Sequence, residues 1–308
     1  GAGHGCLFAD KRGRLWKMDT VSISVNHIFE RRLCLFPAKI AADGRLYTNT
    51  LRGDYPMLLP HDTADPFTQA DAGLSLLSYG CETASSVLDE THDPVRGFDE
   101  NMKTWWSARS GDPGEWLKAD LGREYDVFSV QVNFADQDIV PCGGRDNGFA
   151  YKYTLEGSRD GEAWELLVDR RDNEDDSSHE YFQLPEGTRI RYIRFTNCGI
   201  FPAGGKVAVS GLRLFGFPQG EAPDRAPEFR AERGVDARSM TVSWTPVRGA
   251  EGYFVRFGVD PAELHTQYQL IGECRTEIRS LIRGVHYYVT VDAYSAGSIV
   301  KGTEKQLI

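Results

Sequence analysis

Hydrophobic and polar residues alternate in short runs along most of the chain, with little of the three-and-four spacing of an amphipathic helix. Two clear runs are residues 20–25, TVSISV, and residues 127–134, VFSVQVNF. Between such runs stand turn signals that end in glycine, at Gly13, Gly44, Gly161 and Gly187. Glycine readily adopts the positive φ that tight hairpin turns require. The pattern therefore predicts an all-β protein.

Two polar or proline-rich stretches predict where the chain divides. Residues 61–72 are polar and contain proline, and residues 218–226 belong to a stretch that is too rich in proline for the interior of a strand or helix. We expect three units, at residues 1–60, 73–217 and 227–308. The first holds about four strands, which are too few to bury a core alone. We expect it to be part of something larger.

Composition narrows the classes of function. The 308 residues include 35 Lys and Arg against 45 Asp and Glu, a formal net charge of −10, and 41% of them are hydrophobic. This composition is typical of a folded, water-soluble protein. The acidic balance argues against a nucleic-acid partner, and the apolar stretches are shorter than the roughly 18 residues of a membrane helix. We expect neither nucleic-acid binding nor membrane insertion.

The cysteines give no metal motif. The six are Cys6, Cys34, Cys81, Cys142, Cys198 and Cys274. No two have zinc-type spacing, and we expect free, mostly buried thiols, although the even number also permits disulfides. The chain begins Gly-Ala-Gly-His, without an initiator Met or the pattern of a signal peptide, so we expect a fragment or a processed product.

The middle unit carries a series of ordered motifs. They are residues 95–107 (VRGFDENMKTWWS), 114–122 (GEWLKADLG), 153–164 (YTLEGSRDGEAW), 191–195 (RYIRF) and 210–216 (SGLRLFG). In this order they resemble the discoidin, or factor V/VIII type C, fold, which includes the family 32 carbohydrate-binding modules. The resemblance implies a jelly-roll β-sandwich whose loops bind a glycan.

The loop around Asp99 is a candidate calcium site. Its short oxygen-bearing side chains are the type of ligand that Ca²⁺ prefers. The candidate metal residues are Arg96, Asp99, Asn101, Thr104 and Ser210. In the alternative, Asp and Asn only hydrogen-bond local backbone amides. Gly211 stands where the resemblance places a further carboxylate, which implies weaker binding or a water in its place.

Sugar binding needs an aromatic face and polar side chains on loops. The candidates are Trp105, Arg109, Asp136, Gln137, Asp138 and Phe201. Other interpretations stay open, since Trp105 can simply pack, Arg109 can pair with Asp112, and the acidic residues can form a solvated loop. We expect Trp106, Trp116 and Trp164 in the core.

The flanking units resemble two other families. Residues 240–244 (MTVSW), residues 252–257 (GYFVRF), and Leu281 followed six residues later by Tyr287 resemble a fibronectin type III sandwich, which implies a spacer without chemistry. The segments GHGCLFADKRGRLW and FERRLCLFP, at the start of the chain, resemble the end of a five-bladed glycoside hydrolase family 43 propeller. This resemblance implies a partial propeller blade in which His4 helps to hold an ion, although His4 can also be structural.

Together the resemblances imply the carboxy-terminal region of a bacterial xylosidase or arabinofuranosidase, secreted, periplasmic or at the cell surface. Glycosidases need paired carboxylates, and we assign no catalytic residue because none of the acids before residue 60 has a recognisable acid or base motif. We expect a binding region that tethers the missing propeller to a plant polysaccharide. The alternatives are a structural or protein-interaction assembly without sugar binding, and a complete enzyme whose site forms where the first two units meet.

Overall fold

The structure is a computed structural model, which describes residues 3–22, 31–51, 53–58, 64–69, 74–139, 149–217, 219–295 and 298–308. The helices among these residues are α1 (Pro66–Gln69) and the 3₁₀ helix η1 (Pro94–Gly97), and strands dominate the rest. The all-β prediction is confirmed. No helix in the described part of the chain has the length and apolar character for a bilayer crossing.

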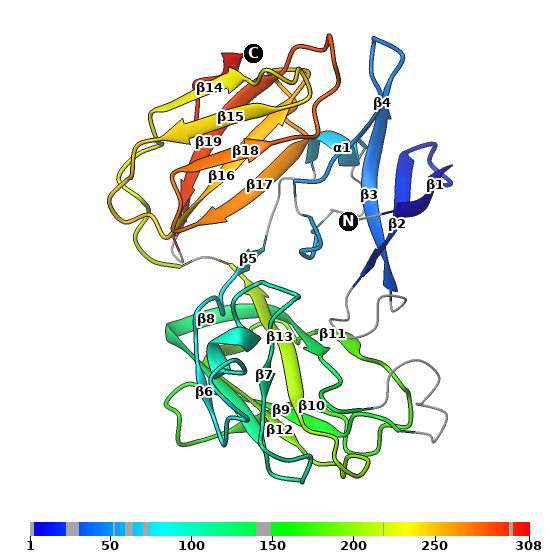
Figure 1. Cartoon of the computed structure of the whole chain (residues 1–308), viewed down its shortest axis with the longest axis vertical. Coiled ribbons are helices and arrows are strands. Elements are labelled where there is room, and N and C mark those ends of the chain that lie inside the picture. The colour runs from blue at the N-terminus through cyan, green and yellow to red at the C-terminus, as the bar shows by residue number, and fades with distance from the viewer. Residues whose placement is uncertain are drawn as a thin grey trace. The chain divides into compact units, whose positions relative to one another are not determined.

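Contacts divide the chain into two compact units, and each is described by itself. The first comprises Gly1–Gly3, Thr20–Leu33 and Ser75–Phe217, and the second comprises His4–Asp19, Cys34–Leu74 and Pro218–Ile308. Figure 1 traces the order of their elements. The expected middle unit thus corresponds to most of the first compact unit, while most of the first sixty residues group with the carboxy-terminal segment.

The first unit is a jelly-roll built from short antiparallel strands. They are β5 (Ser75–Leu76), β6 (Thr83–Ala84), β7 (Trp106–Ser107), β8 (Trp116–Phe134), β9 (Tyr153–Ser158), β10 (Glu165–Asp169), β11 (His179–Gln183), β12 (Arg189–Asn197) and β13 (Ala208–Gly216). The long strand β8 serves both layers, since its first half pairs with β6 and β12 and its second half with β11 and β13 (Figure 1).

Aromatic rings fill the space between the two layers. The Phe134 ring on β8 lies 5.4 Å from that of Tyr153 on β9 and 5.8 Å from that of Phe195 on β12. Trp106 is fully buried, as expected. Burying each such side chain contributes about 1.5–3 kcal/mol, so this cluster supplies much of the stability of the unit.

Two of the expected core tryptophans are only half-buried. Trp116 lies with the Lys118 Nζ 5.9 Å from its ring centre, and Trp164 has the Arg194 guanidinium 4.2 Å from its ring centre. The expectation of a core position was wrong for both, because a cationic side chain and not the apolar interior covers part of each ring.

The amino-terminal strands form a four-stranded sheet in chain order. They are β1 (Gly3–Ala9), β2 (Leu15–Ser22), β3 (Arg31–Ile40) and β4 (Leu46–Thr48). The predicted turn glycines Gly13 and Gly44 have φ of 77° and 78°, and Gly161 and Gly187 in the other unit have 83° and 81°. The predicted turns are therefore confirmed at all four glycines, and the hairpins at Gly13, Gly44 and Gly161, while Gly187 joins β11 and β12, which pair with other strands and not with each other.

The close approach of a neighbouring strand explains the second glycine of the Gly-His-Gly segment. A Cβ added at Gly5 would lie 2.0 Å from Asp19 Oδ1 and 2.3 Å from the carbonyl oxygen of Met18. Only glycine fits there. His4 is exposed and has a positive φ of 56°, and its expected part in ion binding stays a prediction.

The carboxy-terminal segment is a sandwich of two antiparallel sheets. One contains β14 (Phe229–Arg233), β15 (Met240–Trp244) and β18 (Arg275–Ile278), and the other contains β16 (Gly252–Gly258), β17 (Thr266–Ile271), β19 (Tyr288–Tyr294), β20 (Ile299–Val300) and β21 (Gln306–Leu307). Trp244, Tyr253, Leu281 and Tyr287 are buried between them. The Tyr287 hydroxyl accepts a 3.2 Å hydrogen bond from the Ile282 amide, as in the tyrosine corners of β-sandwiches.

Within the second unit, part of the amino-terminal segment packs on this sandwich. The Thr50 amide donates a 2.7 Å hydrogen bond to the His265 carbonyl, and the Tyr55 hydroxyl donates a 2.7 Å bond to Gln269 Oε1. Lys39 forms an ion pair with Glu263. These contacts give the β3–β4 segment the partner surface that its few strands could not provide alone.

Candidate functional site

A hollow of about 590 Å³ lies around Trp105 on the first unit. Its lining comes from the loop before η1 (residues 90–92), from Arg96, from the loop before β7 (residues 103–105) and from Gln137 after β8. Two of the six predicted sugar-binding residues, Trp105 and Gln137, line it together. Two predicted metal residues, Arg96 and Thr104, line it as well.

Trp105 lies directly before the short strand β7 and lines this hollow. Trp106 points inward, and its indole N–H donates a 3.0 Å hydrogen bond to the Ser86 carbonyl. Trp105, by contrast, is half-buried.

The Trp105 ring is held on two sides. Its Nε1 donates a 2.9 Å hydrogen bond to Gln137 Oε1, and its centre lies 5.2 Å from that of the His92 ring, at an interplanar angle of 59°. His92 Nδ1 in turn lies 2.8 Å from Asp89 Oδ1. Hydrogen bonds from the Thr91 hydroxyl and from His92 lower the pKa of Asp89 to about 2. These contacts hold the Trp105 indole in one position.

Backbone geometry after β8 places Gln137. Both of its neighbours have positive φ, 51° at Asp136 and 58° at Asp138. Asp136 is buried and accepts a hydrogen bond from the Tyr151 hydroxyl. Asp138 is exposed and forms an ion pair with Lys206, which lowers the pKa of Asp138. Neither aspartate lines the hollow, but together they fix the turn that presents Gln137.

The other two predicted sugar-binding residues lie apart from the hollow lining. Arg109 donates from Nε to the Val87 carbonyl at 3.0 Å. Phe201 is only 8% exposed, and its ring packs edge to face against Phe149 and Tyr151, with centres 5.0 and 5.7 Å away. Both residues stabilise neighbouring loops in the structure.

The sequence interpretation did not select Glu90, Thr91, His92 or Lys103, although they line the hollow. The polar run before Pro94 is the signal in the sequence that could have pointed to these residues. The sequence does not show that the loop before η1 contacts the loop before β7, because this contact depends on how the two loops pack.

Three of the predicted metal residues, Asp99, Asn101 and Thr104, have oxygens that lie close together. Thr104 Oγ1 lies 2.7 Å from Asp99 Oδ2 and 3.0 Å from the Asn101 carbonyl oxygen. Arg96 Nη1 lies 3.4 Å from Asp99 Oδ2. The alternative also applies in part, since Asp99 Oδ1 accepts a hydrogen bond from the Asn101 amide.

These oxygens fit part of a calcium ligand set, which needs six to eight oxygens. Ser210 contributes no side-chain oxygen to them, because its hydroxyl donates to the Asn133 carbonyl at 3.3 Å. Arg96 is a cation and offers only its backbone carbonyl. Among the described residues, no three His, Cys, Asp or Glu side chains are grouped to hold a metal, so further ligands would have to be carbonyls or water.

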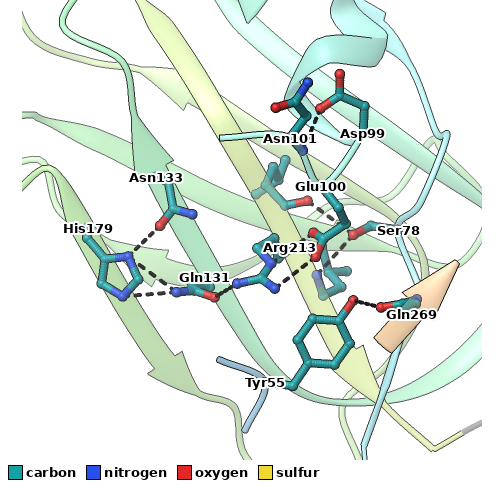
Figure 2. A network of polar contacts seen from close by, with 12 residues as sticks. Tyr55, Ser78, Asp99, Glu100, Asn101, Gln131, Asn133, His179, Arg213 and Gln269 are labelled. Atoms are coloured by element: carbon teal, nitrogen blue, oxygen red, sulfur yellow. Dashed lines mark hydrogen bonds and ion pairs between the residues drawn. The ribbon is translucent and has the colours of Figure 1, made fainter. Parts of the chain in front are cut away.

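A partly buried polar network holds the same loop on β13. Glu100, at a positive φ of 56°, accepts 2.9 Å hydrogen bonds from Nε and Nη2 of Arg213. Arg213 Nη1 donates a 2.8 Å bond to Gln131, whose amide nitrogen contacts His179. Figure 2 shows this series of contacts, from His179 through Gln131 and Arg213 to Glu100, with Asp99 and Asn101 next to it. The ion pair therefore ties the loop that leads to Trp105 to the closing strand of the jelly-roll.

Comparison with known proteins supports the fold of this unit. A family model described as the F5/8 type C domain matches residues 82–205. The chain therefore contains an F5/8 type C, or discoidin, domain. No curated protein matches the chain. The family match includes neither the first sixty residues nor residues 227–308, whose resemblances to a family 43 propeller and to fibronectin type III stay predictions.

Solved structures with similarity to the chain include carbohydrate-binding modules. The chitosan-binding module 1 of a chitosanase/glucanase from Paenibacillus sp. IK-5 is 18% identical, with 46% of this chain and 99% of that chain covered and a TM-score of 0.38. The family 32 module of NanJ from C. perfringens, in complex with galactose, is 18% identical, with 46% and 98% covered and a TM-score of 0.37. The module CpGH89CBM32-5 from Clostridium perfringens, in complex with GalNAc-β-1,3-galactose, is 20% identical, with 46% and 99% covered and a TM-score of 0.36.

Proposed function

We propose that the F5/8 type C domain binds a glycan in the hollow around Trp105. The observation that supports this most strongly is the fixed indole of Trp105 in a hollow of about 590 Å³ lined otherwise by polar side chains. Small-molecule sites typically measure about 300–1,000 Å³ and combine apolar faces with a few placed polar groups. The hollow has a volume in this range and one apolar face, the indole of Trp105, and its other lining residues are polar.

The chemistry of the lining suits a sugar. An indole face packs against the C–H groups of a pyranose ring, which removes apolar surface of both partners from water. The amide of Gln137 and the hydroxyl of Thr91 supply hydrogen bonds for sugar hydroxyls. Because Gln137 and His92 already hold the indole, little side-chain freedom is lost on binding.

Calorimetric titration of the whole chain tests the proposal. The panel contains galactose and chitotriose, as named in the similar structures, and xylo- and arabino-oligosaccharides, as the family 43 resemblance suggests. We expect at least one ligand, with binding weakened about tenfold or more by Trp105→Ala. Tyr181→Ala removes an exposed aromatic ring from β11 and serves as the matched control, which we expect to bind like the wild type. Undiminished binding by the Trp105 variant would exclude this hollow.

We also propose that Ca²⁺ binds at the Asp99 loop. The oxygens of Asp99, Asn101 and Thr104 support this, and a bound ion would stiffen the loop that leads to Trp105. A ligand at 100 times its dissociation constant adds about 2.7 kcal/mol of stability, so we expect the melting temperature to rise by several degrees in Ca²⁺ over chelator. Asp99→Asn should lose this difference. Equal melting curves of the wild type with Ca²⁺ and with chelator would contradict the proposal.

At the level of the parent protein, we propose a bacterial glycosidase of the family 43 type, acting outside the cytoplasm as a xylosidase or arabinofuranosidase. The glycan-binding domain would tether the catalytic propeller to a plant polysaccharide and raise its local concentration, with the last sandwich as a fibronectin-type spacer. The four-stranded sheet β1–β4 agrees with a propeller blade.

The parent protein tests this role. Trp105→Ala in the full-length enzyme should slow hydrolysis of insoluble polysaccharide and leave the rate on soluble nitrophenyl pentosides unchanged. The chain alone should cleave neither substrate, since we assign no catalytic residue in it. Equal rates of the wild type and the variant on the insoluble substrate would show that the domain does not act as a tether.

A further inference from the structure

We infer that the hollow around Trp105 prefers a glycan that carries a carboxylate, such as a chain of uronic acids. This inference rests on the proposed glycan binding and specifies its substrate class. Two cationic side chains, Arg96 and Lys103, line the hollow, and Glu90 is the one acidic residue in its described lining. The formal charge of the lining, from these three residues, is thus +1 on a chain whose net charge is −10.

Arg96 keeps donors for a ligand. Its side chain is 43% exposed, and its contact with Asp99 is a single N to O distance of 3.4 Å. Asp99 Oδ2 also accepts the shorter bond from Thr104. Arg213 provides the contrast, because it is 7% exposed and its guanidinium is fully engaged by Glu100 and Gln131. Arg96 therefore has a free edge with the planar fork that pairs with carboxylates.

The acids next to the hollow already have partners within the protein. Asp89 contacts His92 and the Thr91 hydroxyl, and Asp138 is paired with Lys206. They repel an anionic ligand less than unpaired carboxylates would. Lys103 is exposed on the rim and adds a mobile positive charge.

The placement of these groups suits a uronic acid. With one sugar ring against the Trp105 indole, a carboxylate on that ring or on its neighbour can meet Arg96 and Lys103, which share the lining with the indole. A neutral sugar makes the stacking contact but not the ionic ones. The preference should therefore be electrostatic, and salt should weaken it.

The test compares trigalacturonate with its methyl ester, which differ in charge and not in the sugar. Calorimetric titration of the whole chain at low salt should give an affinity for the acid about three- to fivefold above that for the ester, the scale of an exposed ion pair. The difference should shrink at 0.5 M salt. Arg96→Gln and Lys103→Gln should each reduce it, while Glu90→Gln should increase it. Lys118→Gln, a cation on β8 that does not line the hollow, is the matched control.

The outcomes separate the two claims. If neither form binds and no sugar of the neutral panel binds, the proposed function fails. If the ester binds as tightly as the acid at low salt, or if galactose 6-sulfate but not trigalacturonate binds better than its uncharged counterpart, the carboxylate preference fails while glycan binding stands. If the affinity for the acid stays above that for the ester in both Arg96→Gln and Lys103→Gln, the inferred carboxylate preference is also overturned.

Discussion

Trp105 and Trp106 are neighbours in the chain, yet the structure gives them different surroundings. Trp106 is fully buried in the jelly-roll core and donates to the Ser86 carbonyl. Trp105 is half-buried, lines the hollow and donates to Gln137. One position along the chain thus separates a residue in the core from one that lines the hollow. The comparison teaches that Trp105, the candidate for ligand binding, lies at the edge of the closely packed core.

The largest expected effect on stability follows from substitution of Trp106, the buried member of this pair. Trp106→Ala should lower the free energy of unfolding by about 3–5 kcal/mol, because it removes a fully buried indole and leaves a cavity. Urea denaturation followed by circular dichroism measures this, with Trp106→Phe expected to lose less. A loss below about 1 kcal/mol would show that the two tryptophans do not differ as the structure indicates.

The sequence predicted the parts of this comparison that depend on local pattern. Alternation predicted the strands, turn glycines such as Gly44 predicted the hairpins, and the motif around Trp106 predicted its burial. It did not predict that His92 would lie against Trp105, since this depends on how two loops pack. It also overestimated the burial of Trp116, because cationic side chains cover rings in a way that the pattern does not show.

Two histidines repeat the contrast between surface and interior. His92 lies against Trp105 at the hollow and contacts Asp89. His265, in the second unit, is only 7% exposed and lies 5.1 Å from the Tyr47 ring and 5.9 Å from the Phe67 ring. Burial lowers the pKa of His265 from 6.5 to about 4. A histidine next to an aromatic ring therefore lines a hollow in one unit and packs in the interior of the other.

Lowering the pH should reduce the stability of the second unit, because His265 is buried there. The unfolded chain takes up a proton on His265 near pH 6.5, and the folded chain does so only near pH 4. The contribution that neutral His265 makes to the stability of the second unit is therefore fully present above pH 6.5. It is lost as the pH drops toward 4, and the loss is about 3 kcal/mol at most. A backbone hydrogen bond with Thr48 and the charge of Glu263 act in the opposite direction, since both raise the pKa of His265.

Urea denaturation at pH 7 and pH 4.5 measures the loss. His265→Gln serves as the reference, because it responds to acid only through the other groups of the chain. The wild type should lose more stability than this variant over the same interval. Equal losses would show that His265 is not the buried base that the structure indicates.

A smaller effect is expected where the network of Arg213 meets the loop that leads to the hollow. Glu100→Gln removes the charge that pairs with Arg213 and keeps a similar shape, so we expect a loss of about 1–2 kcal/mol. Because Glu100 ties this loop to β13, sugar affinity should also fall. Glu162→Gln, at an exposed position, is the control for charge alone. Unchanged stability would mean that the ion pair contributes little to holding the loop.

The smallest effect on stability is expected at Trp105 itself. Trp105→Ala removes the contact with His92 and the hydrogen bond to Gln137, so we expect a loss of about 1 kcal/mol or less. The same variant should lose most of its glycan affinity. If instead its unfolding free energy fell as far as that of Trp106→Ala, the Trp105 ring would be a structural element of the fold, and its half-buried face would have no need of a ligand. The ratio of lost affinity to lost stability at these adjacent positions thus separates a binding surface from an extension of the core.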